Sequence, residues 1–471
     1  MSSTLTSLFT TLDSSVQALN AQSYAINITG KNVANLDNPD YSDESVDFAS
    51  GGGETGDGVS IVGVSSARNA LLDNQVVTQT SIASSLTTQQ QFLQTAQSGL
   101  GEDLTNTSAS SSTSTTTSTG TSGLSSALNN FFNSFQSLAA APTSTAQLQS
   151  VYQQASTLTS TFQQTDANLA QVQTQLASQA QSSVADANQQ LQAIASLNGQ
   201  IMAMNSGTPG SAVDLVDERE AAVEKLAADL PITTSQQANG SLEVSMTGTS
   251  GSPVILVNGS TVTGPVAISG TTVTGGASAS TLQVGSGSVF GAFSADGTIQ
   301  TARNSLNALA DQIVTSVNTA YNPGGAAAGN FFDPSGTTAG TIAVSNSLTA
   351  SNLTAGTGAA GDNSVALAIA GLANKTFSTG GGDSINGTIG QYYAGVVTGL
   401  GQTLSNVDDQ VTSENALLNL VQTQRSNASG VSMDTEMGNL MKYQNAYQAS
   451  ARVFSTVNDL FSSLINMGSG A

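Results

Sequence analysis

The sequence predicts a mainly α-helical chain with a small inserted β domain, whose terminal helices pair to form a coiled-coil stalk. Three features predict this. Apolar residues recur at seven-residue steps at both ends, a long middle stretch lacks Gly and Pro, and a Gly-rich stretch with short β-branched runs interrupts the later half. We expect the chain to run from the stalk through a helical middle domain to the β-rich domain, and then back through the middle domain to the stalk.

The amino-terminal segment is predicted to be an amphipathic helix with one apolar face. Ordering its backbone costs about 1–2 kcal/mol per residue, which its hydrogen bonds and apolar burial roughly balance. We therefore expect this helix to fray in an isolated copy and to order when neighbouring copies bury it. The predicted assembly residues are Leu5, Leu8, Phe9, Leu12, Val16, Leu19, Ile26 and Val33.

A helix stop and a turn follow this first helix. Asn35 can cap the helix carboxyl end, and Asn38-Pro39-Asp40 is turn-forming chemistry. The predicted turn motif consists of Asn35, Asn38, Pro39, Tyr41 and Ser42.

The middle of the chain changes composition repeatedly. Residues 105–122 form a Ser/Thr tract without anchoring apolar residues, which is typical of a loop. Residues 143–198 lack Gly and Pro and predict one or two long helices. Further helical patterns cover 212–229, 301–320 and 388–428. Short β-branched runs within 231–300 predict a β-rich insert, and the run TIAVS in the irregular stretch 323–362 is expected to add one strand.

The carboxyl-terminal segment repeats the amphipathic pattern of the first. Ser432 can cap its start, and Asp434 and Glu436 fall in its first turn, where the helix dipole favours acid. The predicted residues for assembly, and for binding a chaperone, are Met433, Met437, Leu440, Tyr443, Tyr447, Phe454, Val457, Phe461 and Leu464.

These elements predict three domains, two of them discontinuous. Residues 1–40 and 430–471 would form the terminal helical assembly domain, residues 41–230 and 301–429 a helical-bundle body that includes the Ser/Thr loop, and residues 231–300 the inserted β-rich domain.

Composition excludes several classes of function. The chain has 471 residues, 31 acidic against 9 basic, a net charge of −22, and neither His nor Cys. It therefore cannot build a Ser-His-Asp triad, a Cys nucleophile or an ordinary zinc site, and its scattered basic residues do not suit nucleic acid. We expect no enzyme activity and no cofactor. The amino terminus lacks the pattern of a signal peptide, and no apolar run is long enough to cross a membrane.

Two terminal segments carry a family resemblance. Asn32–Ser42 resembles the motif that follows the first helix in flagellar rod, hook and hook-associated proteins, which usually have Thr, Gly and Arg where this chain has Asn38, Asp40 and Asp43. Ser429–Phe454 is similar to the last helix of the FlgK family of flagellar hook-associated proteins.

The middle of the chain resembles the same family and not hook proteins. Three features carry this likeness: Phe131-Phe132 before the Gln-rich helix, the run Val213–Glu220, and the late helix from Asn406 to Arg425.

The resemblance implies a structural component that forms the junction ring between hook and filament and permits filament assembly. It implies an extracellular place in the flagellum, reached through the type III export apparatus without a cleaved signal peptide. The implied partners are the hook protein, a second hook–filament junction protein, copies of the chain itself and an export chaperone. No nucleic acid and no membrane insertion are implied.

Alternatives stay open at this stage. A hook or rod subunit shares both end motifs, and the Ser/Thr tract is compatible with a surface adhesin, although no signal or anchor for one is found.

Three acidic or glycine-rich clusters also have two interpretations each. The charged run 217–225 could be paired catalytic carboxylates or a solvated helix face. Gly380–Asp383 could belong to a Ca²⁺-binding repeat or form a turn. The last cluster could hold a divalent ion or form a repelling surface, and we favour the surface; its members are Asp37, Asp40, Asp43, Glu44 and Asp47.

Overall fold

The computed structural model describes residues 2–50, 58–102, 123–205, 212–323, 329–358 and 361–469. The predicted Ser/Thr loop 105–122 lies outside these residues. The chain divides into two compact units. The terminal unit contains Met1–Ser85, Ser182–Val289 and Ser413–Ala471, and the central unit contains Leu86–Gln181 and Phe290–Thr412. The three-domain division stays a prediction.

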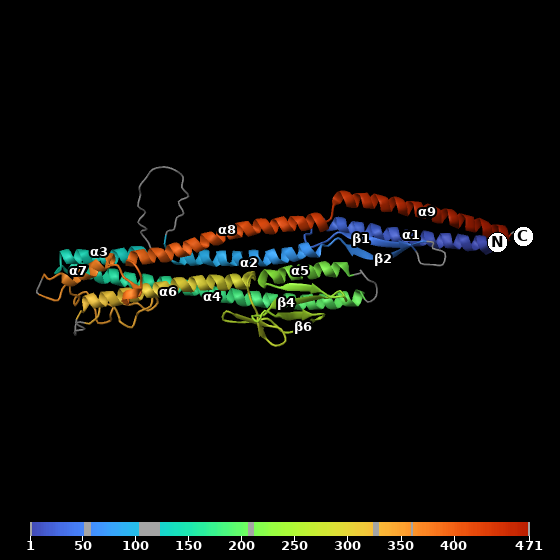
Figure 1. Cartoon of the computed structure of the whole chain (residues 1–471). Helices are drawn as coiled ribbons and strands as arrows, with labels where there is room; N and C mark the ends of the chain where they lie inside the picture. Colours follow the sequence, from blue (N-terminus) through green and yellow to red (C-terminus); the bar gives the residue numbers. More distant parts are fainter. Residues whose placement is uncertain are drawn as a thin grey trace, which may run out of the picture. The chain divides into compact units, whose positions relative to one another are not determined.

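Two long helices from opposite ends of the chain pack along each other in the terminal unit. They are α1 (Ser2–Ala34) and α9 (Met433–Ser469), and both chain ends lie at the same end of the pair (Figure 1). The rings of Phe9 and Phe461 meet edge to face at 4.8 Å between centroids. The predicted pairing of the terminal helices is therefore present, while its coiled-coil geometry stays a prediction.

A two-stranded antiparallel hairpin packs against α1. Its strands are β1 (Glu44–Ser50) and β2 (Val59–Ser66), with Val46 opposite Val64 and a bulge after Asp47. This hairpin was not predicted from the sequence. β1 carries acidic and small residues with little β-branched character, so its strand signal is weak.

The predicted β insert is present in the terminal unit. A helix, α5 (Val213–Asp229), precedes it. One antiparallel sheet has the order β3 (Thr233–Gln236), β4 (Leu242–Thr247), β5 (Pro253–Asn258), β6 (Thr261–Val262), and a second has β7 (Ala267–Ser269), β8 (Thr272–Gly275), β9 (Ser280–Thr281).

The next helix, α6 (Gly287–Tyr321), begins earlier than its predicted start at residue 301. Glycine lowers helix propensity, so Gly287, Gly291 and Gly297 hide the first turns of α6 in the sequence.

Three of the described helices were not predicted from the sequence: α2 (Ala70–Gly99), α3 (Leu124–Ala140) and α7 (Ser364–Gly371). The long helices α4 (Thr145–Asn205) and α8 (Ile389–Ser429) follow the predicted spans closely. The short helix α7 runs into a 3-10 turn, Leu372–Asn374, and a second such turn covers Thr379–Gly381. The run TIAVS forms an isolated bridge, Val344 to Phe332, and not a strand.

An aromatic cluster forms the core of the central unit. Phe131 lies 5.2 Å from Phe132 and from Phe135 between ring centroids, and 5.9 Å from Phe331. All four rings are at most 4% exposed. Within the described residues, no helix combines the length and apolarity that crossing a membrane requires.

Candidate assembly surface

The most buried residues of α1 are small or polar, and they are not those of the predicted apolar face. Ala21 and Ala25 are 1% exposed, Thr29 is 3% exposed and Asn32 is fully buried. Steps of three and four residues place them on one helix face. Asn32, on that face, binds Glu44 at the start of β1, so this is the face beneath the hairpin. Small side chains allow the hairpin to approach the helix closely.

The predicted residues of α1 are only partly covered. Phe9 is 53% exposed and Val16 is 39% exposed, and Leu5 lies in the part of α1 whose side chains the structure does not describe. The others are half-buried: Leu8, Leu12, Leu19, Ile26 and Val33.

Helix α9 leaves even more apolar surface open. Only Glu436 and Val457 are buried among its described side chains. The predicted residues Leu440, Tyr443, Phe454 and Phe461 are half-buried, and Met433, Met437, Tyr447 and Leu464 are exposed. Three further exposed residues are not among the predicted assembly residues: Met441, Val453 and Leu460. Large apolar side chains exposed along a helix in this number mark sites of protein association.

A hydrogen-bonded turn follows α1. The Asn35 side-chain amide donates to the Lys31 carbonyl at 3.0 Å and caps the helix end. The Asn38 side-chain oxygen accepts the amide hydrogen of Asp40 at 3.2 Å, and its carbonyl accepts that of Tyr41 at 3.2 Å. Ser42 is buried, and its amide donates to Asp217 at 2.9 Å. Asn35 and Asn38 therefore act within the turn, whereas Ser42 ties it to α5.

Asn32 joins α1, the turn and α9. Its amide nitrogen lies 2.6 Å from a carboxylate oxygen of Asp43, 2.8 Å from the Glu44 carbonyl and 2.9 Å from a carboxylate oxygen of Glu436. The Tyr41 hydroxyl donates to its side-chain oxygen at 2.7 Å. Burial, and then the negative charge of Glu436, raise the pKa of Asp43. One buried amide thus fixes the start of α9 against the end of α1.

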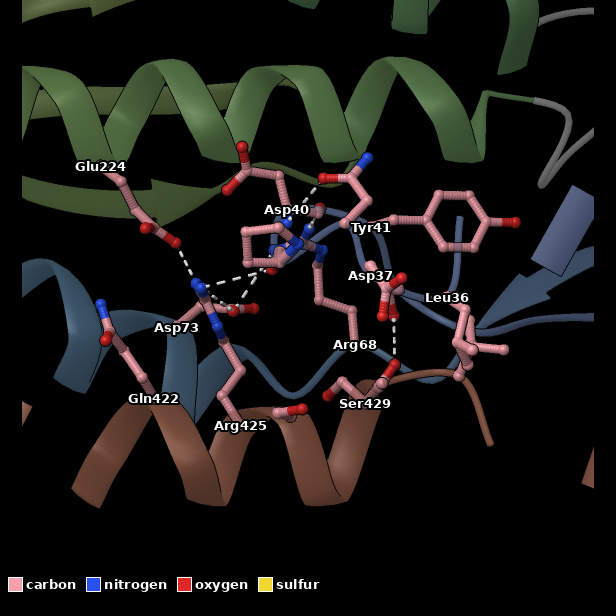
Figure 2. A pocket seen from close by; sticks show the side chains of 16 residues that line it. Leu36, Asp37, Asp40, Tyr41, Arg68, Asp73, Glu224, Gln422, Arg425 and Ser429 are labelled. Carbon is pink, nitrogen blue, oxygen red and sulfur yellow. Dashed lines mark hydrogen bonds and ion pairs between the residues drawn. The ribbon is translucent and has the colours of Figure 1, made fainter. Parts of the chain in front are cut away.

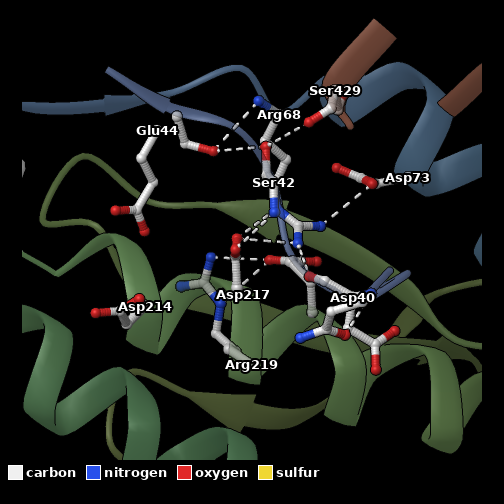
Figure 3. Close-up of polar contacts among 12 residues, drawn as sticks. Asp40, Ser42, Glu44, Arg68, Asp73, Asp214, Asp217, Arg219 and Ser429 are labelled. Carbon is white, nitrogen blue, oxygen red and sulfur yellow. Dashed lines mark hydrogen bonds and ion pairs between the residues drawn. The ribbon is translucent and has the colours of Figure 1, made fainter. Parts of the chain in front are cut away.

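Lys31 and Arg68 connect the turn to the body of the terminal unit. Lys31 binds Glu44 at 2.8 Å and pairs with Asp214 on α5. Arg68 lies 3.0 Å from Asp217 and 3.3 Å from Asp73, and it also donates to the Asp40 carbonyl at 3.0 Å (Figure 3). Burial raises the pKa of Asp73 and of Asp217, although Arg68 opposes the shift.

A second arginine, Arg425 on α8, lies at an open hollow of about 520 Å³ beside the turn (Figure 2). Arg425 pairs with Glu224 and lies 3.8 Å from Asp73. Burial raises the pKa of Glu224, and the charges of Asp40 and Asp73 add to that rise. The hollow is lined by more carboxylates than cations: Asp37, Asp40, Asp73 and Glu224 face Arg68 and Arg425.

The prediction of a solvated face for the charged run on α5 is wrong for two of its residues. Asp217 is 6% exposed and Arg219 is 2% exposed. Arg219 binds Glu220 at 3.0 Å, the Gly240 carbonyl at 2.9 Å and the Asn198 side chain at 3.3 Å. Asn198 lies on α4 and Gly240 in the loop before β4, and no local pattern reveals these two partners. The cluster is structural and ties α5 to its neighbours.

The structure gives no support to a metal site at the acidic cluster beside the turn or at Gly380–Asp383. Among the described residues, no group of three or more acidic side chains is arranged to hold a metal ion. Gly382 has a φ of 95°, and a 3-10 turn precedes it, so the Gly380–Asp383 run forms a turn before α8.

Comparisons with known proteins agree with the resemblance seen in the sequence. A family profile described as "Flagellar hook-associated protein FlgK helical domain" matches residues 110–332, and one described as "Flagellar basal body rod FlgEFG protein C-terminal" matches residues 422–467.

Curated relatives share short segments with the chain. It is 35% identical over 82 residues to flagellar hook-associated protein 1 of Salmonella typhimurium, covering 17% of this chain and 15% of the relative. It is 32% identical over 115 residues to the protein of that name from Bacillus subtilis, covering 24% of this chain and 22% of the relative.

A solved structure of the flagellar hook junction protein FlgK from Burkholderia pseudomallei matches with a TM-score of 0.46 and 23% identity. The match covers 55% of this chain and 46% of that one.

Proposed function

Because the chain belongs to the FlgK family of flagellar hook-associated proteins, we propose that it forms the junction ring between hook and filament in the bacterial flagellum and permits the filament to assemble. The exposed apolar side chains along both terminal helices carry this proposal. They are too numerous for a surface that faces only water, and a ring of identical subunits can cover them.

The architecture of the terminal unit supports an assembly role. α1 and α9 contribute few fully buried large side chains, so much of their apolar area is buried only against another molecule. Each 100 Å² of apolar surface removed from water contributes about 2.5 kcal/mol. The Asn32 contacts hold the base of the helix pair, so neighbouring copies meet a surface that is already aligned.

The proposed partners are the hook protein on one side and a second junction protein on the other, with copies of this chain beside it. An export chaperone is proposed to hold α9 before the chain leaves the cell through the flagellar export channel. Its exposed apolar residues give a chaperone a reason to bind this helix, since they would otherwise promote aggregation in the cytoplasm.

A hook or rod subunit is the second candidate, because the profile over residues 422–467 is that of basal body rod proteins. The helical-domain profile over residues 110–332 favours the junction. A hook subunit is expected to elongate into long polymers when purified, whereas a junction protein should stay monomeric or form only short assemblies, so the length of the assemblies distinguishes the two.

Gene deletion with electron microscopy tests the proposal. We expect hooks without filaments, with filament protein shed into the medium, and restoration by the full chain. A chain truncated after residue 430 should not restore filaments, because it lacks α9. Filaments of normal length and number in the deletion strain would show that the junction assignment is wrong.

A further inference from the structure

Helix α9 carries two basic residues that form no ion pair with any acidic residue that the structure describes. Of the nine basic residues, five form ion pairs with carboxylates: Lys31, Arg68, Arg219, Arg303 and Arg425. Lys442 and Arg452 are exposed, and neither forms an ion pair with any described residue. From residue 437 to 458 the helix has no acidic side chain. In a chain of net charge −22 this face is locally cationic.

The complementary surface lies at the turn after α1. Asp37 and Asp40 are exposed there and line the hollow of about 520 Å³, together with Asp73 and Glu224. Both arginines of the hollow already form ion pairs: Arg425 with Glu224 and Asp73, and Arg68 with Asp73 and Asp217. Neither arginine forms an ion pair with Asp37 or Asp40, so the rim of the hollow keeps negative charge and has room for another basic side chain.

One copy cannot bring these surfaces together. Lys442 lies nine residues beyond the start of α9 and Arg452 lies nineteen, which corresponds to about 14 Å and about 28 Å along a helix rising 1.5 Å per residue. The turn is held at the start of α9, where Glu436 binds Asn32. A second copy shifted along the helix axis can bring its α9 to the turn. Copies of charge −22 repel one another, so a contact between them needs local compensation of charge.

We propose that the cationic face of α9, Lys442 and Arg452, docks on the acidic rim, Asp37 and Asp40, of a second copy of this chain. The inference rests on the proposed assembly function and adds to it the contact that sets the register between copies. The exposed apolar residues supply most of the contact area, and the charges decide which displacement of one copy against the next is stable.

Charge reversal in the complemented deletion strain tests the contact. The double variants K442E/R452E and D37K/D40K should each reduce incorporation into flagella at least about tenfold, which corresponds to about 1.4 kcal/mol. The variant with all four reversals should recover incorporation, because the surfaces are complementary again. The matched control is K225E/E218K, which makes the same kinds of change at exposed α5 positions and should incorporate normally.

The amount of chain in the medium separates assembly from export. Variants that are exported normally but not incorporated support the inference. Loss of export, or four reversals that fail to restore incorporation, overturns it, because α9 then meets an export chaperone or another surface. Normal incorporation of K442E/R452E also overturns it and leaves the proposed function intact, whereas filaments in the deletion strain itself remove the proposed function.

Cross-linking gives an independent readout, since the chain has no cysteine. In flagella built from a K442C/D40C variant, a short bismaleimide should yield dimers and larger ladders on a denaturing gel. The K225C/D40C variant should yield none. Absence of intermolecular products from K442C/D40C in intact flagella contradicts the contact.

Discussion

Helices α3 and α9 differ in how much of their apolar surface is buried within the chain. In α3, of 17 residues, nine are buried, among them Phe131 and Phe135 with no exposed surface. In α9, of 37 residues, two described side chains are buried, and one of those is the carboxylate Glu436. Helix α3 completes its packing within the central unit. Helix α9 is packed along one side only, which is what a subunit needs if its neighbours supply the rest.

Buried polar residues fix the base of the α1–α9 helix pair, whereas buried aromatic rings pack the central unit. At the base of the helix pair Asn32 joins three segments, and Arg68 and Arg425 hold the turn and α8 to the body. Hydrogen bonds specify an arrangement closely but stabilise it modestly. The helix pair is therefore aligned by its base while its length stays available to other copies.

The largest expected effect is in the aromatic core of the central unit. Phe131→Ala should lower the free energy of unfolding of that unit by about 3–5 kcal/mol, because it removes a fully buried ring and leaves a cavity. Urea denaturation followed by circular dichroism measures it. As the control, Leu367→Ala removes a side chain of α7 that is 55% exposed, and it should change stability by less than about 1 kcal/mol.

A smaller and local effect is expected at Asn32. Asn32→Ala removes the amide that Glu436 and Asp43 share and should destabilise the base of the helix pair by about 2–3 kcal/mol. Hydrogen exchange at the first turns of α9 should accelerate, while the central unit keeps its protection. Asn27→Ala changes an exposed residue of the same helix and should have no such effect. Unchanged exchange in Asn32→Ala would mean that α9 is held by other contacts.

Replacing exposed apolar side chains of α9 by serine should hardly change the stability of the isolated chain. Met437 is 46% exposed and Leu460 is 54% exposed, so Met437→Ser with Leu460→Ser should change the unfolding free energy by no more than about 1 kcal/mol. Incorporation into flagella should nevertheless fall severely, because the interface loses apolar area. Leu367→Ser is the matched control and should assemble normally. Equal incorporation of the unmodified chain, the double variant and the Leu367→Ser control would contradict an assembly role for the exposed residues of α9.

The smallest expected effect is a difference in pH dependence between the units. In the terminal unit burial raises the pKa of several carboxyl groups, among them Asp43, Asp73, Asp217 and Glu224. A carboxyl with a raised pKa binds its proton more tightly in the folded state. Its contribution to stability is therefore complete below the unfolded pKa and is lost as pH rises through the folded value. The urea midpoint of this unit should rise as pH falls from neutral.

The central unit has carboxyl groups with the opposite shift. Hydrogen bonds from Ser335 lower the pKa of Asp333, and those from Ser364 lower the pKa of Asp362. Their contribution is present above the ordinary value of about 3.9 and is lost as pH falls through the lowered folded pKa. Urea denaturation followed at individual residues should show opposite dependences of the urea midpoint on pH in the two units. The variant Asp43→Asn should reduce the pH dependence of the terminal unit alone.

Local sequence was sufficient for several elements. Apolar periodicity predicted α1, α4, α5, α8 and α9, because a helix requires only neighbours three and four residues away. The turn at Asn38-Pro39-Asp40 followed from side chains that bond their own backbone. Short β-branched runs between glycines predicted the β insert. The resemblance at both ends predicted the family.

Tertiary contacts decided the rest of the candidate site. Asn32 meets Glu436 across 404 positions of sequence, and Ser42 meets Asp217 across 175, so neither contact has a local signature. Burial of Ala21 and Ala25 in place of the apolar heptad follows from the hairpin, which was not predicted from the sequence. A residue's spacing determines which helix face it lies on. What covers that face depends on segments that only folding brings together, and on α9 much of it is left for another molecule.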